Sequence, residues 1–286
     1  MKVLVTGVTG QLGYDTVECL RERKVECLGT SSSDFDLSDA GATEKFLAEY
    51  QPDAVIHCAA YTNVNQAETD KERCHAVNVE GTKNIAMSCR RLGAKLIYIS
   101  TEYIFDGEGE QYYKPEDAAF PLGVYGRTKY EGELAVKELM EQYFIVRISW
   151  AFGKNGNNFV KTMLRLGAEK PEVRVVMDQI GSPTYTKDVA PLLVDMIATD
   201  KYGVYHVTNE GVCSWAEFTK EIFRQAGLPA KVIPIPSSEY PTPAKRPKNS
   251  RLSKACLDQA GFRRLPAWQD ALSRYLEEIS VDRAGK

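Results

Sequence analysis

Residues 2–13, K-V-L-V-T-G-V-T-G-Q-L-G, join a strand-like run to three regularly spaced glycines. After Lys2, the next four residues are each apolar or β-branched, which predicts a buried strand that ends at Gly7. In a strand–turn–helix unit, Gly7 permits the tight turn, Gly10 lets backbone approach a pyrophosphate, and Gly13 lets the helix pack on the strand. The stretch therefore predicts a dinucleotide site, against the alternative of a plain turn with packing glycines.

Strands and helices alternate along the first half of the chain. Apolar runs of strand length are separated by segments with helical periodicity. This alternation implies right-handed βαβ units, and strands that are apolar throughout need cover on both faces. We predict an α/β fold with a doubly wound parallel sheet of Rossmann type in residues 1–150, as the NAD(P)-binding domain. The expected strands are 2–6, 25–30, 54–60, 95–100 and 143–149, and the expected helices are 14–23, 42–50, 77–91 and one that starts near 125.

The alternation becomes less regular after residue 150. V-R-V-V-M-D (173–178) and Y-H-V-T-N (205–209) are strand-like, and S-W-A-E (214–217) is a capping box before an amphipathic helix. We expect residues 151–286 to form mainly a smaller C-terminal substrate-binding lobe, with some segments returning to the Rossmann sheet. The lobe would lie beside the carboxyl edge of the strands, where open α/β sheets bind ligands.

Composition excludes several classes of protein. The chain has 286 residues, 43% of them hydrophobic and 26% charged, as in ordinary globular proteins. Its net charge of −3 offers no basic field for nucleic acid or a membrane surface, and no apolar run reaches the roughly 18 residues of a membrane span. The N-terminal apolar run is too short for a signal peptide. Seven cysteines without a C-x-x-C pair indicate free thiols, so we expect a cytoplasmic protein.

Tyr125 and Lys129, in V-Y-G-R-T-K-Y-E-G-E, are a candidate acid–base pair. At i and i+4 the two side chains share one helix face, and a nearby ammonium would lower the phenol pKa from its usual value of about 10. Tyr125 could then donate a proton to a carbonyl oxygen. Thr101, with Ser100 before it, ends the fourth strand, where a hydroxyl can orient that carbonyl. A solvated helix face is the alternative for Y-x-x-x-K alone.

These three features occur in the order and spacing of the extended short-chain dehydrogenases/reductases, which the chain resembles. The resemblance implies a nicotinamide cofactor. The acid that would hold the ribose hydroxyls of NAD is missing after the second strand, where Gly29-Thr30-Ser31 stands. Its absence removes repulsion of a 2′-phosphate, to which Thr30 or Ser31 could donate. We therefore predict NADPH, with NADH left open because no arginine is obvious nearby.

Longer strings narrow the resemblance. From Met1 to about Trp268 the chain is similar to dTDP-4-dehydrorhamnose reductases. The strings that carry this similarity are C-A-A-Y-T-N-V-N-Q-A-E, S-T-E-Y-I-F-D-G, R-I-S-W-A-F-G, D-Q-I-G-S-P-T and R-P-K-N-S-R-L. A turn aspartate and a core aromatic are the alternatives for Asp36 and Trp150. The roles that the resemblance implies are pyrophosphate contact for Gly10, Gln11 and Leu12, adenine contact for Asp36 and Leu37, cofactor contact for Ala59, Ala60 and Thr62, proton donation by Tyr125 with the help of Lys129, contact with the sugar for Thr101 and Glu102, and packing on the substrate for Trp150.

Glu102 departs from the family pattern, which usually has aspartate after the Ser-Thr pair. The carboxylate is kept on a longer stem, so its charge is retained while its reach into the sugar pocket is altered. Related sugar-nucleotide dehydratases carry Asp-Glu after this threonine, whereas Tyr103 follows Glu102 here. The pair therefore favours simple reduction over dehydration.

A proline-rich loop carries four basic side chains, Lys245, Arg246, Lys248 and Arg251. They could clamp a diphosphate, since arginine offers a planar fork to phosphate oxygens. A solvated basic loop is the alternative for any one of them, and Arg246 is our candidate substrate ligand.

The resemblance implies reduction of the 4-keto group of dTDP-4-dehydro-L-rhamnose to dTDP-L-rhamnose, a step that supplies surface polysaccharide. Two alternatives stay open: a non-catalytic dinucleotide-binding subunit like the regulatory subunit of methionine adenosyltransferase, and a reductase or epimerase of another nucleotide sugar. The sequence decides neither an Mg²⁺ requirement nor the oligomeric state. No acidic metal cluster stands out, so no metal ligand is predicted, and a homodimer is one assembly that the sequence permits.

Overall fold

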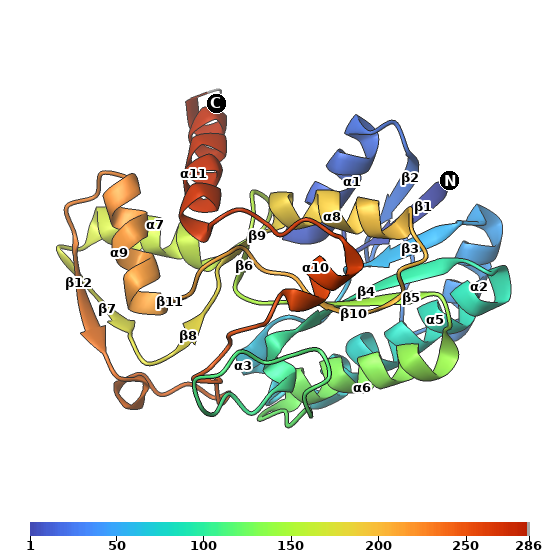
Figure 1. The fold of residues 1–286 in the computed structure, drawn as a ribbon, viewed down its shortest axis with the longest axis horizontal. Helices are drawn as coiled ribbons and strands as arrows, with labels where there is room; N and C mark the ends of the chain where they lie inside the picture. Colours follow the sequence, from blue (N-terminus) through green and yellow to red (C-terminus); the bar gives the residue numbers. More distant parts are fainter. Residues whose placement is uncertain (285–286) are drawn as a thin grey trace.

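A computed structural model describes residues 1–284, and side chains as far as residue 280. Its main element is a six-stranded sheet in the order β10-β5-β4-β3-β1-β2 (Figure 1). Every strand pair in this sheet is parallel, which confirms the predicted α/β class and doubly wound sheet. The strands are β1 (Lys2–Thr6), β2 (Glu26–Thr30), β3 (Ala54–His57), β4 (Lys95–Thr101), β5 (Tyr143–Ile148) and β10 (Gly203–His206).

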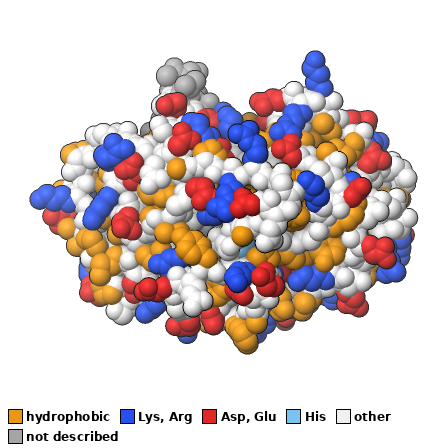
Figure 2. Space-filling view, in the orientation of Figure 1, with side chains coloured by type: hydrophobic (Ala, Val, Ile, Leu, Met, Phe, Trp, Pro, Cys, Tyr) orange, Lys and Arg blue, Asp and Glu red, His pale blue; other side chains and the backbone are white. Residues whose placement is uncertain are grey.

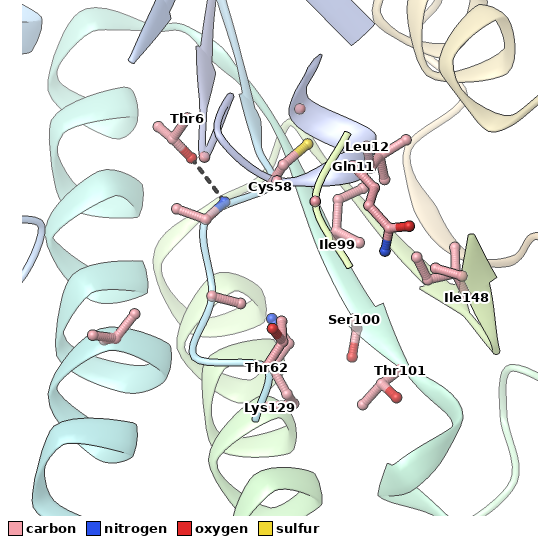
Figure 3. A pocket seen from close by; sticks show the side chains of 18 of the residues that line it. Thr6, Gln11, Leu12, Cys58, Thr62, Ile99, Ser100, Thr101, Lys129 and Ile148 are labelled. Carbon is pink, nitrogen blue, oxygen red and sulfur yellow. Dashed lines mark hydrogen bonds between the residues drawn. The ribbon is translucent and has the colours of Figure 1, made fainter. Parts of the chain in front are cut away.

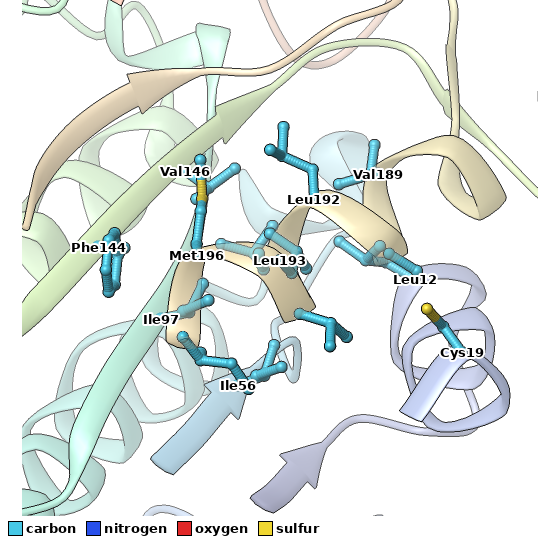
Figure 4. Close-up of a cluster of buried hydrophobic side chains, with 14 of the residues drawn as sticks. Leu12, Cys19, Ile56, Ile97, Phe144, Val146, Val189, Leu192, Leu193 and Met196 are labelled. Carbon is cyan, nitrogen blue, oxygen red and sulfur yellow. The ribbon is translucent and has the colours of Figure 1, made fainter. Parts of the chain in front are cut away.

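Helices cover both faces of the sheet because successive strand residues point to opposite sides. Val3 and Val5 pack with α1 (Gln11–Glu22) and α8 (Thr186–Ile197) on one face. Leu4 faces the other side, which α2 (Ala40–Tyr50), α5 (Gly81–Leu92) and α6 (Val124–Leu139) cover. Figure 4 shows the first of these layers, with the α8 side chains Val189, Leu192, Leu193 and Met196 beside Ile56, Ile97 and Val146 of the strands.

A second group of elements, all after residue 150, has a core of its own. Phe152, Phe218 and Tyr275 are fully buried there and their rings contact one another. In Figure 1 this lobe lies at the left, at one end of the sheet. The division at residue 150 stays a prediction. The lobe contains α7 (Phe159–Glu169), α9 (Trp215–Gln225), α11 (Trp268–Ala284) and three two-stranded sheets, β7 (Glu172–Val176) with β12 (Lys231–Ile235), β8 (Ile180–Gly181) with β11 (Cys213–Ser214), and β6 (Ala151–Phe152) with β9 (Thr184–Tyr185).

Several local predictions are confirmed. Ser214 accepts from the Glu217 N–H at 3.1 Å while the Glu217 carboxylate accepts from the Ser214 N–H at 2.7 Å, which is the expected capping box. Gly93 ends α5 with φ of +68°. All seven cysteines are free. The strand-like run at 205–209 contributes to β10, which pairs with β5 in the main sheet.

Most predicted boundaries differ from the observed ones by one to three residues, and two of the differences lie near the site. β3 stops at His57, because Cys58 and Ala59 leave the sheet to meet the glycine turn: a Cβ on Gly7 would lie 2.6 Å from the Ala59 nitrogen. The predicted helix 77–91 is part of a longer segment in which α4 (Lys71–His75) and a π-helix (Ala76–Glu80) run directly into α5. Such π-turns are often found at functional sites. The other short elements are α3 (Val64–Ala67), α10 (Ala255–Ala260) and 3-10 turns at Glu102–Ile104 and Ser237–Glu239.

A buried ion pair joins α6 to the sheet. Arg147 of β5 is 2% exposed and donates from Nε and Nη2 to the two oxygens of Glu133, at 2.9 and 2.7 Å. Glu133 is fully buried and also accepts from the Ser100 hydroxyl at 2.5 Å. Arg147 Nη1 donates to the Pro115 carbonyl at 3.0 Å and lies 3.2 Å from Nε2 of His206 on β10. The pair therefore connects α6 with β4, β5 and β10.

The surface carries both signs of charge. In Figure 2, basic and acidic side chains alternate over the face drawn. Within residues 1–284, no helix is long and apolar enough to cross a membrane. Across the described side chains, no group of three or more histidine, cysteine, aspartate or glutamate residues is arranged to hold a metal ion.

We predict that Arg147→Met and Glu133→Gln each lower the free energy of unfolding by about 3–5 kcal/mol, because each leaves one buried charge or dipole without its partner. The double variant should cost clearly less than the sum of the two, since neither charge is then orphaned. Urea unfolding of the four proteins measures this cycle. Additive losses would show that the pair contributes no coupling.

Candidate functional site

One cavity of about 710 Å³ opens at the carboxyl edge of the sheet and is lined by every predicted site residue except Lys245, Lys248 and Arg251 of the basic loop. Figure 3 shows side chains from the glycine turn, β4 and α6 facing it from different sides. The carboxyl ends of parallel strands meet at one edge, so the grouping follows from the topology. The predicted residues on its wall are Gly7, Gly10, Gln11, Leu12, Gly13, Thr30, Asp36, Leu37, Ala59, Ala60, Thr62, Thr101, Glu102, Tyr125, Lys129, Trp150 and Arg246.

The glycine turn is built for close approach of backbone. Gly7 has φ of +75°, and a Cβ on Gly13 would lie 2.4 Å from the Gly7 carbonyl oxygen. Gly10 caps α1 without any side-chain hydrogen bond, so the first N–H groups of the helix are left to a ligand. A helix N-terminus of this kind fits the pyrophosphate of a dinucleotide.

The second strand leads to the far end of the cavity. The Thr30 hydroxyl donates to the Val5 carbonyl at 3.4 Å and is therefore turned toward the sheet. Asp36 accepts from the hydroxyl and the N–H of Ser38, and these bonds lower the pKa of its carboxyl. Arg73 of α4 also lines the cavity and lies close enough to Asp36 to help lower the pKa of its carboxyl. Sequence reasoning missed this arginine, because α4 is far from β2 along the chain.

Tyr125 and Lys129 lie on the cavity wall, but their charges differ from our expectation. Lys129 is 2% exposed, its Nζ lies 4.0 Å from the ring centroid of Tyr98, and burial lowers its pKa to about 7. The pKa of Tyr125 is raised, first by burial and then by Glu102. Burial and Glu102 therefore dominate the Tyr125 pKa here, and the lowering of that pKa by Lys129 stays a prediction.

Thr101 and Glu102 form a hydrogen-bonded pair beside Tyr125. Glu102 is 3% exposed and accepts from the Thr101 hydroxyl at 2.8 Å. Burial raises the pKa of Glu102 to about 7, and the Thr101 bond opposes this rise. The Thr101 hydroxyl also favours the ionised form of Tyr125 by hydrogen bonding, which partly opposes the rise of the Tyr125 pKa. Ser100, by contrast, is occupied by Glu133, so Thr101 is the strand-end hydroxyl that faces the cavity.

The remaining predicted residues come from the C-terminal half. Trp150 lines the cavity together with Trp215, which the sequence presented only as the first residue of a capped helix. Arg246 donates to the Tyr103 hydroxyl at 3.2 Å. It also lines a neighbouring cavity of about 220 Å³ with Lys245 and Lys248. Arg251 lines neither of these two cavities and donates to Asn249 at 2.9 Å.

The arrangement has two chemically distinct ends. Glycine backbone, a helix N-terminus and Arg73 suit the phosphates of a dinucleotide at one end. A protonated phenol, a hydroxyl and a carboxyl of near-neutral pKa suit proton donation to a carbonyl at the other. The proline-rich loop with Lys245, Arg246 and Lys248, called the cationic loop below, lies beyond that second end, where a further phosphate group could bind.

Comparisons with known proteins agree over nearly the whole chain. The family model described as RmlD substrate binding domain matches residues 1–281. The spore coat polysaccharide biosynthesis protein SpsK of Bacillus subtilis is 38% identical over 279 residues, covering 98% of each chain. The crystal structure of a dTDP-4-dehydrorhamnose reductase from Clostridium acetobutylicum is 41% identical with a TM-score of 0.96, covering 98% of this chain and 100% of that one. The Bacillus anthracis dTDP-4-dehydrorhamnose reductase in complex with NADP is 42% identical with a TM-score of 0.95, covering 97% and 100%.

We predict that Gly13→Ala weakens NADPH binding at least tenfold, because the added methyl group would push α1 away from the Gly7 carbonyl. Fluorescence titration of NADPH measures the affinity. Gly41→Ala is the matched control: it also lies in the first turn of a helix, and the nearest atom to its Cβ is a flexible Asp39 oxygen at 3.4 Å. Equal affinity in both variants would contradict the proposed role of the turn.

The raised pKa of Glu102 predicts a pH-dependent loss of stability. Between pH 4.5, its ordinary pKa, and about 7, the folded protein binds more protons at this carboxyl than the unfolded chain, so stability falls as pH rises. The full loss is about 3 kcal/mol, at about 1.4 kcal/mol per pKa unit.

Urea unfolding of the wild type and of Glu102→Gln from pH 4 to 8 isolates this loss as the difference between the two stability curves, because the titrations of Asp15, His57 and His206 are common to both proteins. Glu110→Gln, at an exposed position, should keep the wild-type slope. The same slope in Glu102→Gln and wild type would show that another group is responsible.

Proposed function

This chain belongs to the RmlD substrate binding domain family, and from that premise we propose that it reduces the 4-keto group of dTDP-4-dehydro-L-rhamnose to dTDP-L-rhamnose with NADPH. The observation that carries the proposal is that Thr101, Tyr125 and Lys129 share one cavity with the glycine turn. Two solved structures at 41% and 42% identity bear the name of this reductase, and one of them is described with NADP.

The cofactor would bind along the glycine turn. The backbone of Gly10, Gln11 and Leu12 would hold its pyrophosphate, and Asp36 and Leu37 its adenine. When bound, NADPH supplies the hydride that adds to C4 of the sugar. NADH stays an alternative cofactor to be measured beside it.

Tyr125 would supply the proton. Its raised pKa keeps the phenol protonated at neutral pH, so it can donate to the carbonyl oxygen as negative charge develops there. The Thr101 hydroxyl would turn its proton from Glu102 to the same oxygen, and Lys129 would stabilise the phenolate that remains. Each turnover thus adds one hydride at carbon and one proton at oxygen.

The sugar end would be bounded by Glu102 and Trp150, with Arg246 and the cationic loop at the diphosphate. Because the pKa of Glu102 is about 7, its carboxyl is mostly protonated below that pH and can then act as a neutral hydrogen-bond donor. A relative named for spore coat polysaccharide synthesis is 38% identical. The identity of the sugar is therefore the most specific part of the proposal.

We predict that purified protein oxidises NADPH when given dTDP-4-dehydro-L-rhamnose, and that Tyr125→Phe lowers kcat at least a hundredfold with NADPH affinity unchanged. The reason is that the phenol proton is lost while the cofactor contacts remain. Loss of NADPH absorbance measures turnover.

Tyr130→Phe is the matched control, because this tyrosine of the same helix packs in a separate apolar cluster with Ile104 and Phe105. Near-wild-type activity of Tyr125→Phe would overturn the proton-donor role. Cofactor binding without turnover of any tested sugar nucleotide would overturn the reductase and favour a dinucleotide-binding subunit.

A further inference from the structure

Trp150 has an unusual backbone conformation on the cavity wall. Its φ is +47°, in the left-handed region that residues other than glycine seldom adopt. Its carbonyl accepts from the Thr184 N–H at 3.1 Å, where β6 and β9 begin to pair. Backbone strain of this kind persists only where the surroundings hold the residue in place, and it gathers at ligand sites.

Trp215 is the first of two residues that hold the Trp150 side chain in place. Its indole stacks on that of Trp150 with ring centroids 3.5 Å apart and 10° between the planes. Phe159 lies against Trp215 at 4.4 Å between centroids. Because Trp215 is the first residue of α9, directly after the capping box at Ser214, its backbone is fixed by that cap. Both indoles are half-buried and both line the large cavity.

Gly181 is the second residue that holds the Trp150 indole in place. A Cβ at this position would lie only 2.6 Å from Cε2 of Trp150, too close for the indole ring to keep its place. Gly181 pairs with Cys213 in the ladder of β8 and β11, two residues before Trp215. The β8–β11 ladder therefore positions both Gly181, which leaves room for the Trp150 indole, and Trp215, whose ring stacks on that indole.

We propose that Trp215 and Gly181 are positioning residues that hold Trp150 as the apolar wall of the sugar site, so that the two stacked indoles receive the C–H face of a hexose ring. The inference rests on the proposed function and extends it to residues that do not carry out proton or hydride transfer. Aromatic faces suit this task because they offer large, rigid apolar area with little rotamer freedom to lose. A 6-deoxy sugar, with a methyl group in place of a hydroxyl, gives such a wall more apolar surface to contact.

Two variants disturb the pair from opposite sides. Trp215→Ala removes the stacking ring, and Gly181→Ala pushes the Trp150 indole away while keeping every tryptophan. Each should raise KM for dTDP-4-dehydro-L-rhamnose at least tenfold, change kcat less than threefold and leave the Kd of NADPH unchanged. Each should also abolish the exciton-coupled circular dichroism expected of two stacked indoles. Trp215→Phe should recover part of the KM, and Gly41→Ala should match wild type throughout.

The outcomes separate the two levels of the proposal. Wild-type turnover with an unchanged KM in both variants would overturn the positioning role alone, whatever happens to the dichroism. A raised KM in Trp215→Ala with equally weakened NADPH binding would also overturn it, because that pattern indicates general damage. If Trp215→Ala fails to fold, Gly181→Ala decides by the same readouts. Absence of wild-type turnover with every sugar nucleotide would overturn the proposed function, and this inference with it.

Discussion

The ion pair between Arg147 and Glu133 ties the helix that carries Tyr125 and Lys129 to the middle of the sheet. Both side chains are withdrawn from water, so each charge must be satisfied by neighbours, and the geometry is bidentate. Glu133 follows Lys129 by one helical turn and uses its remaining capacity on Ser100. A shift of α6 along its axis would break all of these bonds together. The pair therefore helps to hold α6, and with it Tyr125, in register with β4 and β5.

The cleft disfavours charge, and this shapes how its groups behave. Burial lowers the pKa of Lys129 and raises those of Glu102 and Tyr125, so three ionisable groups approach their neutral forms near neutral pH. A pair of buried histidines, His57 and His206, responds in the same direction, with each pKa lowered to about 3. Such a site is poised for the charges that a bound phosphorylated ligand and a reacting carbonyl would bring.

The two halves of the chain are interleaved rather than placed end to end. α8 and β10 come from beyond residue 150, yet they complete the main sheet and one of its helix layers. Asn155 and Asn158 reach back to the glycine turn, where Asn155 donates to the Thr9 carbonyl at 3.0 Å and Asn158 to the Gln11 side chain at 2.9 Å. The glycine turn, where we propose that the cofactor binds, is thus supported by the later half of the sequence.

The sequence by itself determined the parts of this protein that depend on local periodicity and local backbone freedom. The spacing of Gly7, Gly10 and Gly13, the alternation of strands and helices, and the i, i+4 relation of Tyr125 and Lys129 all follow from neighbours in the chain. Only the tertiary structure decided what depends on contacts between distant segments. The approach of Arg73 to Asp36, the stacking of Trp215 on Trp150 and the engagement of Ser100 by Glu133 have no local signal. The ionisation of the site was decided there too, because desolvation depends on everything that packs around a group, and the sequence reports only what lies beside it in the chain.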